Sequence, residues 1–63
     1  MDKDFWKSFL RFLDEANSAE IQQRLLKTRT LLENGINNAE VRADTKRIIR
    51  FLEQEIVARS ANH

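Results

Sequence analysis

The sequence predicts an all-α domain of three helices, in which a short aromatic-rich N-terminal helix packs on a long antiparallel helical hairpin. The 63 residues contain no Pro and one Gly, a composition that favours long uninterrupted helices. Apolar residues recur at helical spacing in three segments, about 3–16, 18–34 and 38–59. A chain of this length forms one domain, residues 1–63.

The first predicted helix, about 3–16, has the broadest apolar face. Asp2 or Asp4 is placed to cap its start. At 100° per residue its apolar face spans roughly 160° of the helical wheel, wider than the ~100° of an ordinary core stripe. The residues on this face are Phe5, Trp6, Phe9, Leu10, Phe12, Leu13 and Ala16.

The second predicted helix, 18–34, begins and ends with capping residues. Asn17 is a good N-cap, and Glu20 three residues later completes the pattern of a capping box. After the last helical residue, Gly35 suits the left-handed conformation and Ile36 the apolar contact of a Schellman ending.

The third predicted helix starts after Asn37 or Asn38, either of which is a suitable cap, and continues to about Arg59. We expect residues 60–63 to fray. Because the connection to the second helix is short, the two long helices should pack antiparallel.

Core residues of the two long helices alternate steps of four and three, the spacing of heptad a and d positions. Thr28 and Thr45 occupy central places in these seams, and each hydroxyl can donate to a carbonyl three or four residues earlier. Either they fix the register of the two packed helices through their polar groups, or they are tolerated at the boundary of the core. The similar spacing of the two helices is better explained by an ordinary antiparallel hairpin than by duplication of one helix in the sequence. The seams are Ile21, Leu25, Thr28 and Leu32, and Val41, Thr45, Ile48 and Leu52.

Composition argues against catalysis, so we predict that the protein is not an enzyme and binds no cofactor, metal or small molecule. Without Cys there is no disulfide framework and no thiolate zinc site. One Gly cannot build a phosphate loop, and the lone His63 cannot form a His-rich metal site. No apolar run approaches 18 residues and no signal peptide is recognisable, so we expect a cytoplasmic protein without a membrane partner.

The aromatic helix is the first feature that can carry function. A hairpin groove covers only about half of so wide an apolar face, and large exposed aromatic residues usually mark interfaces. We therefore predict a protein-interaction module, an adaptor or regulator, that self-associates through this helix. The alternative is that the helix simply closes a three-helix bundle. The interface candidates are Phe5, Trp6, Phe9, Leu10, Phe12 and Leu13.

The basic middle of the hairpin is the second such feature. Residues 21–32 hold three bases and no acid, and residues 41–52 hold four bases against one acid. This pattern indicates either an anionic partner such as a nucleic acid or a solvated face. One open face without carboxylates would favour the nucleic acid. The candidate residues are Lys27, Arg29, Arg42, Lys46 and Arg50.

Overall fold

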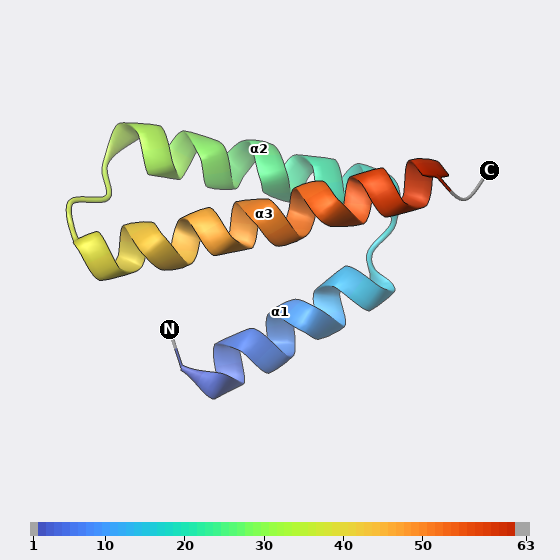
Figure 1. Ribbon diagram of the computed structural model, residues 1–63, viewed down its shortest axis with the longest axis horizontal. Helices are drawn as coiled ribbons and strands as arrows, with labels where there is room; N and C mark the ends of the chain where they lie inside the picture. The colour runs from blue at the N-terminus through green and yellow to red at the C-terminus, as the bar shows by residue number, and fades with distance from the viewer. Residues whose placement is uncertain (1, 62–63) are drawn as a thin grey trace.

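The computed structural model describes residues 2–61, and these form three α-helices without a strand (Figure 1). Helix α1 spans Lys3–Glu15, α2 spans Ser18–Asn34 and α3 spans Ala39–Ala61. The predicted all-α class is confirmed. Helix α3 extends two residues past the predicted end at about Arg59, through residues 60 and 61. Asn62 and His63 lie outside the described residues.

The three helices form a hairpin with a third helix against it. Figure 1 shows α2 and α3 side by side and antiparallel, with α1 tilted against them. The end of α1 lies near the start of α2, because only Ala16 and Asn17 separate the two helices. The predicted packing of a short N-terminal helix on a long hairpin is therefore observed.

The core lies where the three helices meet. Ile21 of α2 and Leu52 of α3 are completely buried, at 0% exposure. Burial of such side chains is the main favourable contribution to folding. The other buried apolar residues are Phe9, Leu13, Ala16, Leu25 and Ile48.

The two seam threonines are buried and satisfied as predicted. The Thr28 hydroxyl donates to the Arg24 carbonyl at 2.7 Å, and the Thr45 hydroxyl donates to the Val41 carbonyl at 2.7 Å. Towards the α2–α3 turn the seam opens. Val41, which its spacing places in the seam, is 38% exposed.

Side-chain caps begin both α1 and α2. The Phe5 N–H donates to Asp2 Oδ1 at 2.9 Å, so Asp2 rather than Asp4 caps α1. The predicted capping box of α2 is confirmed. The Glu20 N–H donates to Asn17 Oδ1 at 2.9 Å, and the Asn17 N–H donates to Glu20 Oε1 at 3.0 Å.

The α2–α3 turn differs from the predicted Schellman ending. Gly35 has a φ of 175°, which is extended, and no described residue has a left-handed φ. The Arg42 guanidinium instead donates to the carbonyls of Leu32 and Ile36, at 3.2 and 3.1 Å. Asn38 caps α3, accepting from the backbone N–H groups two and three residues later. The turn is thus closed by a side chain of the following helix.

Candidate protein-interaction surface

Large aromatic side chains connect α1 to the hairpin. Phe9 is buried and lies at the centre of a row of rings, 6.1 Å from Phe5 and 6.5 Å from Phe12 between ring centroids. Trp6 and Phe9 each lie 6.2 Å from Phe51 of α3. These separations are typical of favourable aromatic pairs. Phe51, the one aromatic residue outside α1, therefore provides the ring-to-ring contact on the hairpin.

An arginine from each hairpin helix lies over an aromatic ring of α1. The Arg24 guanidinium carbon of α2 is 4.3 Å from the centre of the Phe12 ring, and that of Arg47 of α3 is 4.9 Å from Trp6. Each cation–π contact stabilises the packing by about 0.5–1 kcal/mol at exposed sites. Arginines thus lie along both edges of α1.

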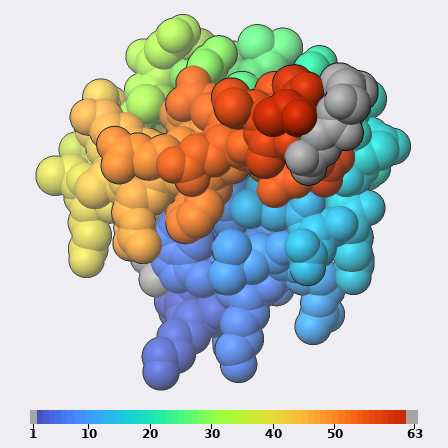
Figure 2. Space-filling view, turned by 45° about the vertical axis from the view of Figure 1, so that its right-hand side comes forward, coloured from blue at the N-terminus to red at the C-terminus, as the bar shows by residue number. Residues whose placement is uncertain are grey.

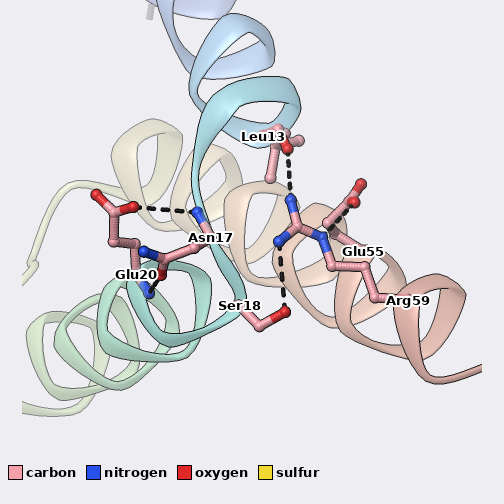
Figure 3. A network of polar contacts seen from close by, with 6 residues as sticks. All are labelled: Leu13, Asn17, Ser18, Glu20, Glu55 and Arg59. Carbon is pink, nitrogen blue, oxygen red and sulfur yellow. Dashed lines mark hydrogen bonds and ion pairs between the residues drawn. The ribbon is translucent and has the colours of Figure 1, made fainter.

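Arg59 fixes the corner between α1 and α2 (Figure 3). Its guanidinium donates to the Leu13 carbonyl at 3.0 Å and to the Ser18 hydroxyl at 3.5 Å. Its Nε also donates to Glu55 at 2.9 Å, one helical turn earlier on α3. The end of α1 and the start of α2 are therefore both bonded to the last turns of α3.

The structure separates the six interface candidates into an inner and an outer group. Phe9 and Leu13 are buried in the core. Phe5, Trp6 and Phe12 are half-buried, and Leu10 is 50% exposed. The alternative reading, that α1 closes the bundle, accounts for the inner group. The outer group keeps surface that a partner can reach.

The five basic candidates do not form one open face. Arg29 makes an ion pair with Glu53 across the hairpin. Arg42 is half-buried on the carbonyls of the α2–α3 turn. Lys27, on α2, and Lys46 and Arg50, on α3, are exposed. Arg29 and Arg42 therefore do not lie on an open face without carboxylates, which is the arrangement that would favour a nucleic acid.

Parts of the aromatic helix and of the basic hairpin meet beside α3. A small open cleft of about 210 Å³ is lined by Arg47, Arg50, Phe51 and Gln54. Figure 2 shows side chains of α3 and α1 in contact along this part of the molecule. We call this region the α1–α3 surface, and define it as the cleft residues together with Trp6 and Leu10 of α1.

The α1–α3 surface was only partly visible in the sequence. The sequence predicts Trp6 and Leu10 for a protein interface and Arg50 for a separate anionic site. Arg47, Phe51 and Gln54 were missed. Only the rotation and tilt of α1 against α3 bring these residues together, and no local pattern encodes those quantities.

A second exposed apolar region lies on the outer side of α2. Leu26 and Leu31 border a shallow depression with Lys27 and Thr30, and Leu26 is 67% exposed. No aromatic side chain lines it. Leu31 is also exposed, at 62%, so the two leucines form a small apolar patch on α2.

Comparisons with protein-family models, with curated proteins and with solved structures found no match. Between residues 2 and 61, no helix is both long and apolar enough to cross a lipid bilayer. In the same part of the chain, no three His, Cys, Asp or Glu side chains gather as metal ligands.

Proposed function

We propose that this chain is a small non-enzymatic interaction module, an adaptor or regulator, that binds a protein partner through the α1–α3 surface. One observation carries the proposal: Trp6 packs against Arg47 and Phe51, two of the residues that line an open cleft, and lies one turn before the exposed Leu10. Trp and Arg are the residue types most enriched among interface side chains that dominate binding energy.

The packing of this surface also suits binding. Trp6 contacts Phe9 and Phe51, and Phe9 is buried. Side chains that are already ordered lose less conformational entropy when a partner binds. The cleft of about 210 Å³ is smaller than the ~300–1,000 Å³ of small-molecule pockets, which favours a protein side chain as its occupant.

Binding of a nucleic acid is less well supported. Single-stranded nucleic acids stack on open aromatic faces, whereas Arg47 already lies over the Trp6 ring. Arg29 and Arg42 are engaged within the protein. The remaining candidate bases are divided between α2 and α3.

Photo-crosslinking tests the proposed function. A photo-reactive phenylalanine analogue would replace Leu10 in one variant and Leu26, an exposed leucine of α2, in a matched control. We expect a discrete protein adduct in native extract from position 10 only, and its loss when excess unmodified chain is added. Equal adducts from both positions, or an adduct insensitive to competition, would contradict the proposal.

Self-association through α1 remains a separate prediction. A two-fold interface built on the α1–α3 surface would bring like charges, Arg47 and Arg50 of each copy, into the same interface. Sedimentation over a wide concentration range tests it. A constant mass of 7.5 kDa, together with a melting temperature independent of concentration, would rule self-association out.

A further inference from the structure

We infer that the partner segment bound by the α1–α3 surface is an acidic amphipathic helix of another protein. The inference rests on the proposed function and adds the chemistry of the partner. It is drawn from the charge around the surface and from the arrangement of its apolar residues. A second copy of the chain would bring positive charges to a surface that is already positive, which favours another protein as the partner.

The charge around the α1–α3 surface is mainly positive. Lys46 and Arg50 are exposed and lie one helical turn apart on α3, with Arg47 between them in sequence. On α1, Lys7 is exposed and lies one turn before Leu10, whereas Asp14 lies one turn after it. Complementary charge accelerates association and selects partners. A partner with carboxylates along one edge fits this distribution.

Nearby acids on the C-terminal half of α3 are already engaged. Glu53 pairs with Arg29 across the hairpin, and Glu55 pairs with Arg59. Their charge is therefore compensated within the protein. Asp44 lies one turn before Arg47, so Lys46 and Arg50 are the bases of this side of α3 that keep most of their potential for an external carboxylate.

The apolar residues of the α1–α3 surface lie beside the cleft, on α1 and on the facing side of α3. Trp6 and Leu10 lie one turn apart on α1, and Phe51 packs against Trp6 from α3. Amphipathic helices bind apolar surfaces through side chains spaced three or four residues apart. The 13 residues of α1 span about 20 Å at 1.5 Å per residue, so a partner helix of between three and four turns matches its length.

Fluorescence of Trp6 gives a direct measurement, because Trp6 is the only Trp of the chain. The probe is a 14-residue helical peptide with leucines on one face and glutamates beside them. The control peptide carries lysine in place of each glutamate. We expect the acidic peptide to shift the Trp6 emission saturably and at least tenfold more tightly than the control, with affinity falling as salt rises.

Charge reversal on the protein sharpens the test. Lys46→Glu should lower the affinity for the acidic peptide several-fold. The matched substitution Lys27→Glu on α2 should leave that affinity unchanged. Lys46→Glu combined with Arg50→Glu should reverse the preference towards the lysine peptide. All three residues are exposed, so the variants should fold, and circular dichroism checks that they do.

Three results would overturn the inference. The first is no saturable change in Trp6 emission, or equal affinity for both peptides. The second is tighter binding of single-stranded oligouridylate than of the acidic peptide. The third is a Trp6 emission that changes with the concentration of the chain itself, which would identify a second copy as the occupant. Either of the first two results would reject only the acidic partner if photo-crosslinking at position 10 still gives a protein adduct that excess unmodified chain removes. The proposed function would then stand.

Discussion

The two connections between the helices are built differently. The α1–α2 corner has two residues, of which Ala16 is buried and Asn17 forms a reciprocal capping box with Glu20. The α2–α3 turn has four residues, 35–38, and its residues are half-buried or exposed. Each connection also receives an arginine of α3, Arg59 at the first and Arg42 at the second.

The difference shows which contacts define each corner. The α1–α2 corner combines a local cap with the core, since Ile21 directly follows Glu20 of the capping box and is fully buried. The α2–α3 turn lies beyond the buried part of the seam, where Val41 is exposed. A cap and a charged side chain stabilise it with little apolar burial. Mutations should therefore affect the two corners by different amounts.

The largest expected effect is at the core side of the α1–α2 corner. Ile21→Ala should lower the free energy of unfolding by about 3 kcal/mol, because it removes buried methyl groups and leaves a cavity. Val41→Ala, next to the other corner, should cost less than about 1 kcal/mol. Urea denaturation measures both values. If Ile21→Ala does not fold, Ile21→Val should still cost about 1 kcal/mol. A larger loss for Val41→Ala than for Ile21→Val would contradict the comparison.

An intermediate effect is expected at Arg42. Arg42→Ala should cost about 1.5–2 kcal/mol, because it leaves the half-buried carbonyls of Leu32 and Ile36 without their charged donor. Arg42→Lys should recover less than half of the loss, since an ammonium group lacks the planar fork of a guanidinium. Thermal unfolding followed by circular dichroism measures these changes. A fully stable Arg42→Ala variant would show that the turn closes without this residue.

The smallest effect is expected at Gly35. Its φ is extended rather than left-handed, and a methyl group built there would meet no atom within 4 Å. Gly35→Ala should therefore change the free energy of unfolding by no more than about 0.5 kcal/mol. A Schellman ending predicts a loss near 1 kcal/mol instead, from the cost of a left-handed alanine. Chemical denaturation resolves the two values.

Local rules predicted much of this fold. The capping box at Asn17 and Glu20 depends on residues three apart, and the hydroxyl bonds of Thr28 and Thr45 on residues four apart. The three helices followed from apolar periodicity and the near absence of Gly and Pro. All these features are determined within one helical turn, so the sequence contains the information directly.

Contacts between helices were not predictable in the same way. The reach of Arg42 back to the turn, and the position of Arg47 over Trp6, depend on how the helices rotate and tilt against one another. The ending of α2 was wrongly predicted because a side chain of α3 satisfies a carbonyl that a left-handed glycine would otherwise help to satisfy. The α1–α3 surface arises from the same long-range packing.

The bond between Arg59 and the Leu13 carbonyl has a consequence for the order in which the protein folds. It joins residues 46 positions apart, whereas the hairpin turn joins neighbours in the chain. Closing a long loop costs more chain entropy than closing a short one, so α2 and α3 should pair early in folding and α1 should dock late. Contacts that form after the transition state slow unfolding more than they speed folding. Arg59 should therefore slow the undocking of α1 once the molecule has folded, together with the contacts of Trp6 and Phe9 with Phe51.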